Sequence, residues 1–201
     1  MPRIRSLSLS EFDPELLSLL NAEQKTEREL RPTSIRAHHP ELAKAYLRFG
    51  GALKTHSVLS ARLRELVRLR IAFHNQCRSC MAMRYADAVD DGVSEHLVCS
   101  LEQPQEAPDL TLAERVALRY ADLLANNHLA IDEAFYVQLR AHFSDKELVE
   151  LGTVCAICIG FGRLSATWDM TEDLPERFRA QGDAPVTPWG PDAWVTHRAR
   201  A

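Results

Sequence analysis

Two cysteines three positions apart, Cys77 and Cys80, are the residues of this chain best suited to redox chemistry. Cysteines at this spacing can close into a small disulfide ring and reopen, and the thiolate is the reactive form. A thiolate at the start of a helix is also stabilised by the positive end of the helix dipole. Glu65 lies twelve residues before Cys77, and Arg84 lies four residues after Cys80. Together these residues indicate a candidate redox centre.

The neighbours of the cysteines suggest how such a centre would work. In a helix that begins at Cys77, the side chains of Cys77, Cys80 and Arg84 share one face, so the guanidinium can stabilise the Cys80 thiolate. Glu65, on the preceding helix, could carry protons to and from the thiols, and His74 is a second candidate for this role. Each of Glu65, His74 and Arg84 taken singly is more typical of a surface or structural position. Their joint spacing is what favours the functional interpretation.

Three further cysteines need a separate interpretation. Cys155 and Cys158 lie in an apolar run, which predicts that they pack in the core, because a buried cysteine behaves as a small hydrophobe. The alternative is a four-cysteine zinc site that joins both pairs. It is disfavoured because such sites generally take one pair from a polar or Gly-rich turn, whereas both pairs here fall on expected helices. Cys99 has no partner and is expected to be structural, and no metal or cofactor is expected.

The composition of the chain is that of an ordinary globular protein. It has 201 residues, of which 46% are hydrophobic and 26% charged, with a formal net charge of -4. Such a chain can bury a core and lacks the basic excess of a nucleic-acid binder, so the arginines from Arg62 to Arg70 predict a solvated helix face or an interface. Residues 1–10 show no export signal, and the apolar run around residues 151–161 is too short to span a bilayer. We therefore expect a cytoplasmic protein without a nucleic-acid or membrane partner.

The periodicity of apolar residues predicts an all-α fold, with a single domain of packed helical hairpins over residues 1–174. Residues 175–201 hold several Pro and Trp residues and predict an irregular tail that lies over the surface of this chain or of a neighbouring subunit. No segment reads convincingly as a strand. Residues 74–76 predict a break before the cysteines, and residues 102–109 a loop. The expected helices run from Ser10 or Asp13 to about Ala22, from Pro40 to Gly50-Gly51, from Ala61 to about Phe73, from Cys77 to Asp90, from Ser94 to about Cys99, from a capping box at Thr111 to about Asn126, from Ile131 to His142, and from a second capping box at Ser144 through Trp168.

Glu65, the eleven residues that follow it and Cys77-Arg78-Ser79-Cys80 form a pattern that resembles the alkyl hydroperoxidase D and carboxymuconolactone decarboxylase superfamily. The likeness covers roughly residues 40–170 and extends to the helices that open at residues 112 and 144. The resemblance implies an all-α fold of helical hairpins and a homo-oligomer, whether dimer, trimer or hexamer. It also implies a thiol-dependent peroxidase or disulfide oxidoreductase.

The resemblance also assigns roles to individual residues. Cys80 would attack the hydroperoxide, Cys77 would resolve the resulting sulfenic acid, and Glu65 would belong to the proton relay, with Arg84 and His74 in support. The reductant would be a dithiol or a lipoyl-type partner. Arg84 and Ser79 stand where the best-known members carry histidine, and arginine cannot relay a proton at neutral pH.

Three alternatives to a peroxidase stay open. One is a thiol redox sensor without turnover, which the arginine at position 84 favours. Another is an enzyme of the carboxymuconolactone decarboxylase type that uses a pocket near Glu65 and His74 and does not need the cysteines. The third is the structural zinc protein.

Overall fold

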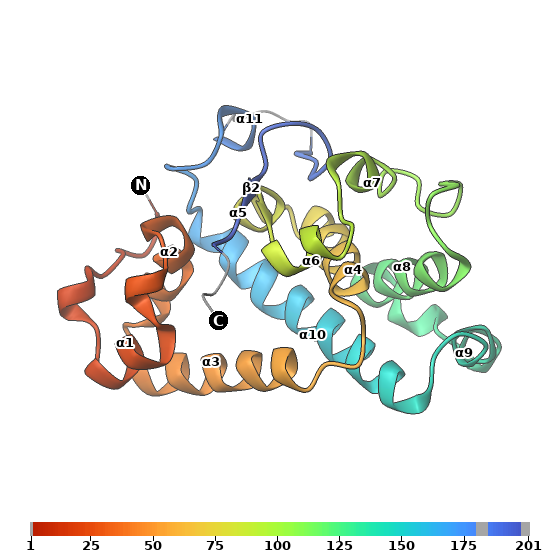
Figure 1. Cartoon of the computed structure of the whole chain (residues 1–201), viewed down its shortest axis with the longest axis horizontal. Coiled ribbons are helices and arrows are strands. Elements are labelled where there is room, and N and C mark those ends of the chain that lie inside the picture. The colour runs from red at the N-terminus through yellow and green to blue at the C-terminus, as the bar shows by residue number, and fades with distance from the viewer. Residues whose placement is uncertain (1, 180–184, 198–201) are drawn as a thin grey trace.

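A computed structural model describes residues 2–179 and 185–197 of the chain. These residues form an almost entirely helical architecture, as the sequence predicts, with one pair of two-residue strands (Figure 1). Three helices make up the centre of the molecule: α4 (Ala61–His74) packs against both α8 (Leu112–Asn126) and α10 (Asp145–Trp168).

Helix α4 carries the predicted Glu65 and is the most deeply buried of the three. The side chain of Ser60 caps its first turn by accepting a hydrogen bond from the backbone N–H of Leu63. Its apolar residues recur at helical spacing and are completely buried from Leu66 to Ile71, apart from the polar positions between them. The main hydrophobic core therefore fixes the orientation of this helix.

The N-terminal helices form a separate layer with a small core of its own. Helices α1 (Pro14–Leu20), α2 (Glu27–Arg36) and α3 (Pro40–Thr55) lie together at one side of the molecule (Figure 1). The expected end of α3 at Gly50-Gly51 is wrong, because the helix continues through both glycines to Thr55. Helix α2 was not expected from the sequence, although Thr26 and Glu29 form a capping box at its start.

The single helix expected from Cys77 to Asp90 is also wrong. The chain forms α5 (Arg78–Met81), then the strand β1 (Met83–Arg84), then α6 (Ala86–Asp90). The cause lies far away in the sequence, because β2 (Trp194–Val195) pairs in parallel with β1. The backbone N–H of Trp194 donates to the carbonyl of Ala82 at 2.9 Å, and these long-range hydrogen bonds hold the segment extended. The expectation that the chain has no strand is corrected by the same pair.

Helices α8 and α10 and the short helix after Ser94 begin at predicted caps, whereas the cap at Asp132 was not predicted. Thr111 with Glu114 and Ser144 with Glu147 form the two capping boxes predicted for α8 and α10. Ser94 caps α7 (Glu95–Cys99), and Asp132 caps α9 (Glu133–Arg140), which is shorter than the expected helix from Ile131 to His142. Three short 3-10 turns cover Leu9–Glu11, Ala22–Gln24 and His128–Ala130.

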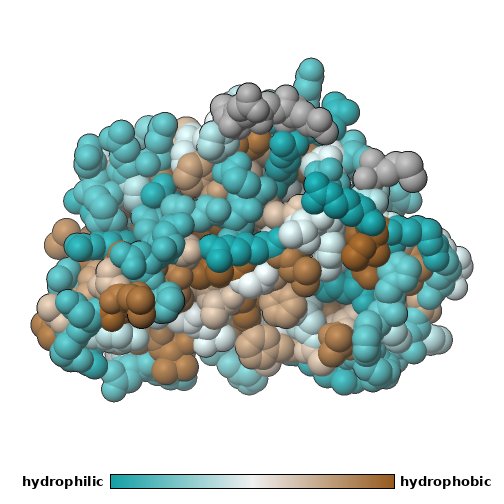
Figure 2. Space-filling model, turned by 180° about the vertical axis from the view of Figure 1, so that it is seen from behind, coloured by the Kyte–Doolittle hydropathy of each residue, from teal (hydrophilic) through white to brown (hydrophobic). Residues whose placement is uncertain are grey.

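Helix α10 is only partly covered by the rest of the described chain. It is long and apolar enough to cross a membrane by length and composition, with a mean hydropathy of 1.5, and 33% of that window is buried. Core helices of soluble proteins pass the same test, so this is weak evidence for a membrane span. The sequence analysis expected no membrane span because the apolar run around residues 151–161 is too short. The helix that contains this run is longer, with 24 residues. Apolar residues also gather in a band across the lower half of the face shown in Figure 2.

The C-terminal part of the chain returns to the cysteine segment. It contains the short helix α11 (Glu176–Arg179), although no regular helix was expected there, and then residues 185–197, which we call the strap. The strap lies over the same chain, where β2 pairs with β1. The division of the chain at residue 175 stays a prediction.

Candidate redox site

Cys77 and Cys80 are joined by a disulfide, with their Cα atoms 5.2 Å apart. They differ in access, because the side chain of Cys77 is 0% exposed whereas Cys80 is half-buried. Cys77 is the N-cap residue of α5, which has only four residues. So short a helix has a small macrodipole, and the expected stabilisation of a thiolate by a long helix does not apply.

Glu65 is buried, with an exposure of 2%, and its carboxylate is held by groups near the cysteines. Its oxygens accept hydrogen bonds from Arg68 at 2.7 and 2.8 Å, and one of them also accepts from the backbone N–H of Tyr85 at 3.1 Å. Glu65 is therefore connected to the cysteine segment through an arginine that lies three residues further along the same helix.

Arg68 is the residue of this site that the sequence analysis missed. Its guanidinium donates to the carbonyl of Cys80 at 2.7 Å and to the carbonyl of Met83 at 2.7 Å, in addition to Glu65. Despite the opposing effect of burial, the carboxylate of Glu65 raises the pKa of Arg68, so the cation is fixed beside Cys80. The signal that could have found it is the i,i+3 spacing from Glu65.

Arg84 is not on the same helical face as Cys80, so that expectation is wrong. Because β1 is extended, the guanidinium of Arg84 turns away into a buried pocket with an exposure of 1%. There it donates to both carboxylate oxygens of Glu95, at 2.8 and 3.0 Å, and to the carbonyls of Met81 and Pro188 at 2.7 Å. Its charge is thus engaged by Glu95.

His74 also lies in a different set of contacts. Its Nε2 is 2.6 Å from a carboxylate oxygen of Asp122 on α8, and Arg70 binds the same carboxylate. Glu65 and His74 are nine residues apart on α4, which corresponds to roughly 13 Å along the helix axis. The two side chains therefore lie in separate sets of contacts, and the pocket near both residues that the decarboxylase alternative expects stays a prediction.

Three of the arginines from Arg62 to Arg70 are engaged by carboxylates and do not form the solvated face that was one expectation; the other expectation, an interface, stays a prediction. Arg62 pairs with Glu114 at 2.6 Å, Arg68 with Glu65 at 2.7 Å, and Arg70 with Asp122 at 2.6 Å. All three pairs are partly buried, because α4 runs through the middle of the fold.

A cleft of about 360 Å³ borders the turn between the two cysteines. Its walls come from that turn, from the C-terminal end of α10 and from the strap. The Oγ atom of Ser79 in this wall lies 3.7 Å from the Sγ atom of Cys77, which in a disulfide can only accept a hydrogen bond. The lining residues are Gln76, Arg78, Ser79, Ser165, Ala166, Asp169, Met170, Thr171, Pro185 and Val186.

The other three cysteines are unpaired thiols. Cys155 is buried in the main core and Cys158 packs against that core, as predicted. Burial raises the pKa of the Cys158 thiol to about 11, although the positive charge of Arg68 acts in the opposite direction. Cys99, expected to be structural, is exposed. Among the residues that the structure describes, no group of three or more His, Cys, Asp or Glu side chains could hold a metal ion.

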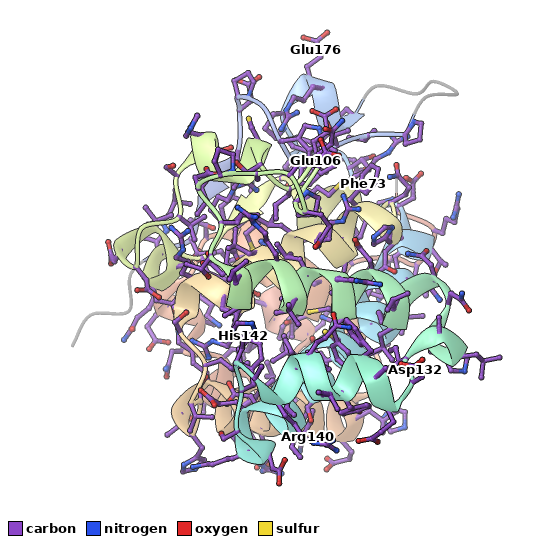
Figure 3. All side chains as sticks on the ribbon, turned by 90° about the vertical axis from the view of Figure 1, so that its right-hand side faces the viewer. Phe73, Glu106, Asp132, Arg140, His142 and Glu176 are labelled. Carbon is purple, nitrogen blue, oxygen red and sulfur yellow. A yellow bond between two sulfur atoms is a disulfide. The ribbon has the colours of Figure 1, made fainter. Side chains whose placement is uncertain are left out.

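The disulfide follows the C-terminal end of α4 and lies beneath the C-terminal segments. Figure 3 shows Phe73 near this end, below Glu176 of α11, while α8 and α9 lie in front. The ring of Phe73 packs against Trp189 of the strap with centroids 4.9 Å apart.

The part of the chain that contains the site matches a known family. Residues 40–123 match the model of the carboxymuconolactone decarboxylase family. The chain is thus similar to this family over less than half of its length. The matched stretch includes Glu65, Arg68, both cysteines of the disulfide and Arg84.

Several proteins resemble the chain around this stretch. Two uncharacterized proteins from strains of Mycobacterium tuberculosis are 45% identical over 89 residues, which is 43% of this chain and 31% of theirs. The uncharacterized protein YnjA of Escherichia coli is 29% identical over 119 residues, which is 59% of this chain and 63% of YnjA. The chain therefore spans less than two thirds of the length of these relatives.

A solved structure extends the likeness beyond the matched stretch. It is the crystal structure of a protein of unknown function from Agrobacterium tumefaciens, provisionally named an antioxidant defence protein, AhpD. The match has a TM-score of 0.60 and 22% identity, and covers 69% of this chain and 94% of that protein. At this level of identity the likeness shows the fold, which is AhpD-like.

Proposed function

We propose that the protein is a thiol-dependent peroxidase, in which Cys80 attacks a hydroperoxide and Cys77 resolves the product. The observation that carries this proposal is the unequal access of the two cysteines. Cys80 is half-buried and lies next to a fixed cation, whereas Cys77 is completely buried. A nucleophile needs access and a stabilised thiolate, and a resolving thiol needs only to reach its partner.

The proposed reaction is a two-electron reduction of the hydroperoxide. The Cys80 thiolate attacks the terminal oxygen of ROOH, the O–O bond breaks, and Cys80 becomes a sulfenic acid while RO⁻ takes up a proton and leaves as ROH. The Cys77 thiol then attacks the sulfur of Cys80, which releases water and forms the disulfide. A dithiol or lipoyl-type reductant returns the pair to two thiols and is itself oxidised to a disulfide.

Arg68 and Glu65 have complementary roles in this proposal. Because the guanidinium of Arg68 binds the Cys80 carbonyl, its charge favours the thiolate of Cys80. Glu65 keeps that guanidinium in place with two hydrogen bonds, and we retain it as the candidate member of the proton relay. Arg84 and His74 support the fold around the site through Glu95 and Asp122.

The test is a peroxide-consumption assay with a dithiol donor on matched cysteine variants. Cys80→Ser is expected to lose turnover by at least about 100-fold, because the attacking atom is removed. Cys99→Ser is the control, since Cys99 is an exposed thiol outside the disulfide, and it should keep the wild-type rate. Unchanged turnover in Cys80→Ser would contradict the proposal.

A redox sensor without turnover is the second candidate. It is favoured by one observation, that Arg84 and His74 are both engaged by carboxylates and neither contacts a sulfur atom among the described interactions. In this case one equivalent of hydroperoxide would form the disulfide in reduced protein, but no dithiol would support repeated cycles.

We also propose that the protein acts in the cytoplasm as a homo-oligomer. The exposed apolar residues of α3 and α10 support a second copy as the partner for these faces, because apolar side chains gathered on two neighbouring elements are typical of interfaces. They include Leu42, Phe49, Val149, Phe161 and Leu164.

A further inference from the structure

The strap is fastened at the residue immediately before the cysteine pair. The side-chain amide of Gln76 binds the backbone of Val186 twice, donating to its carbonyl at 3.1 Å and accepting from its N–H at 2.9 Å. Gln76 precedes Cys77 directly. The strap is therefore bound to one end of the redox segment by a two-point contact.

The strap is fastened again just beyond Cys80. The backbone N–H of Trp194 donates to the carbonyl of Ala82, and the N–H of Thr196 donates to the carbonyl of Arg84, both at 2.9 Å. These bonds belong to the β1–β2 pair. The strap consequently crosses the whole disulfide segment from Gln76 to Arg84.

The buried guanidinium of Arg84 joins the strap to the body of the protein. One of its amino groups donates to the carbonyl of Pro188 at 2.7 Å, while the pairing with Glu95 fixes its position. Arg177 adds a bond to the carbonyl of Trp189 at 2.9 Å. The arginine at position 84 thus serves as a positioning residue for the strap.

The strap contributes apolar cover on the side of Cys80. Val186 and Trp194 pack against the same small hydrophobic cluster as Cys80, which is built around Met81 and Phe178. The 360 Å³ cleft lies beside this cover, and it is lined by Arg78 and Ser79, the two residues between the cysteines. That volume falls within the range of small-ligand sites, about 300–1,000 Å³. A protein partner instead needs roughly 800 Å² of contact surface around the reacting atoms.

We propose that the strap selects the reductant of the Cys77–Cys80 disulfide by size, admitting low-molecular-weight dithiols and excluding protein dithiols. This inference rests on the proposed function. In the admitted reaction, a thiolate of the small dithiol attacks one sulfur of the disulfide and forms a mixed disulfide. Its second thiol then displaces the protein, which leaves with two thiols, while the small molecule departs as a disulfide.

The test compares reduction of the oxidised protein by dithiothreitol and by reduced thioredoxin, a protein dithiol. The reference is an oxidised peptide of residues 75–82, in which the same disulfide has no strap. For the wild-type protein, the ratio of the thioredoxin rate to the dithiothreitol rate should be at least about tenfold lower than for the peptide. A ratio equal to that of the peptide would overturn the proposal.

The double variant Gln76→Ala/Trp194→Ala removes one fastening point and the largest covering side chain. It should raise the thioredoxin rate at least about tenfold and change the dithiothreitol rate less than about twofold. Hydrogen exchange at the amides of Trp194 and Thr196 should show that the strap is released. The control is Val195→Ala, because the Val195 side chain is exposed, and it should match the wild type.

Each other outcome contradicts the proposal. A released strap with an unchanged rate ratio would show that the strap does not select the reductant. Amides that stay protected in the double variant would contradict the fastening of the strap at Gln76 and Trp194, on which the proposal rests. The proposed peroxidase function is tested separately, because it is decided by peroxide turnover in the wild type and in Cys80→Ser, whereas the selectivity depends on reduction alone.

Discussion

At the scale of residues, three arginines of α4 decide the electrostatics of the molecule's centre. Each of them, Arg62, Arg68 and Arg70, binds a different carboxylate. The pair of Arg68 with Glu65 lies at the redox segment, whereas the pair of Arg70 with Asp122 joins α4 to α8. His74 adds a third member to the second group. A buried charge that loses its partner is costly, so these pairs should be visible in stability measurements.

The pH dependence of stability should report on Asp122. Although burial opposes it, hydrogen bonds from His74 and Arg70 hold the pKa of this carboxyl below its usual value of 3.8. A carboxyl whose pKa is lowered in the folded state contributes stability that is present above the unfolded value. That contribution is lost as the pH falls from about 4 through the folded-state pKa.

We therefore expect Asp122→Asn to destabilise the protein by about 2 kcal/mol at pH 7, because it leaves the arginine with a neutral partner. The difference from the wild type should shrink on acidification below about pH 4. Urea unfolding at several pH values measures this. A constant difference between the two proteins from pH 7 to pH 3 would contradict the assigned role.

At the scale of elements, two glycines in helices differ in the space around them: one has room for a side chain and the other does not. Gly51 lies within α3, and a Cβ atom built there meets no atom within 4 Å. Gly162 lies within α10, where a Cβ atom would come within 2.5 Å of the side-chain nitrogen of Asn75. That amide donates to the carbonyl of Cys158 at 2.8 Å and so joins the end of α4 to α10.

The same substitution should therefore have opposite effects at the two sites. Gly51→Ala should stabilise the protein by about 0.5–1 kcal/mol, because alanine loses less backbone entropy in a helix. Gly162→Ala should destabilise it by at least about 1 kcal/mol, since Asn75 must move away from Cys158. Thermal unfolding of both variants tests this, and a destabilised Gly51→Ala would show that this face of α3 is covered.

At the scale of the whole molecule, the N-terminal helices and the main core are two packed groups. The apolar residues of α1 to α3 form their own cluster around Leu16 and Leu30, separate from the core around α4. Phe49 on α3 is 48% exposed and Phe161 on α10 is 37% exposed. A second copy of the chain that covers these faces would bury the apolar side chains that are exposed in a single chain.

The proposed homo-oligomer gives the prediction at this scale. Sedimentation or light scattering at micromolar concentration should give a mass of at least twice that of one chain. Phe49→Glu or Phe161→Glu should shift it towards the monomer, because a charge would be buried at the interface. Leu129→Glu is the control, as Leu129 is more exposed but lies outside α3 and α10. A wild-type protein that is monomeric would rule out the proposal.

The sequence by itself determined those features that depend on local chemistry. The caps at Ser60, Thr111 and Ser144 and the helical spacing of apolar residues fix the starts and the buried faces of α4, α8 and α10, because capping and amphipathicity act within a few residues. The pairing of Cys77 with Cys80 follows from their short spacing for the same reason, whereas the burial of Glu65 depends on the packed fold.

Only the tertiary structure decided the surroundings of the cysteines. The segment from Cys77 to Asp90 has the pattern of a helix, but hydrogen bonds from Trp194 and Thr196, more than a hundred positions away, hold Met83–Arg84 extended. In the extended segment Arg84 binds Glu95 and does not approach the sulfur atoms. The cation that contacts Cys80, at its carbonyl, is Arg68. Local propensity is weak compared with a set of long-range hydrogen bonds and buried ion pairs, so the partner of each charge is set by the packed fold.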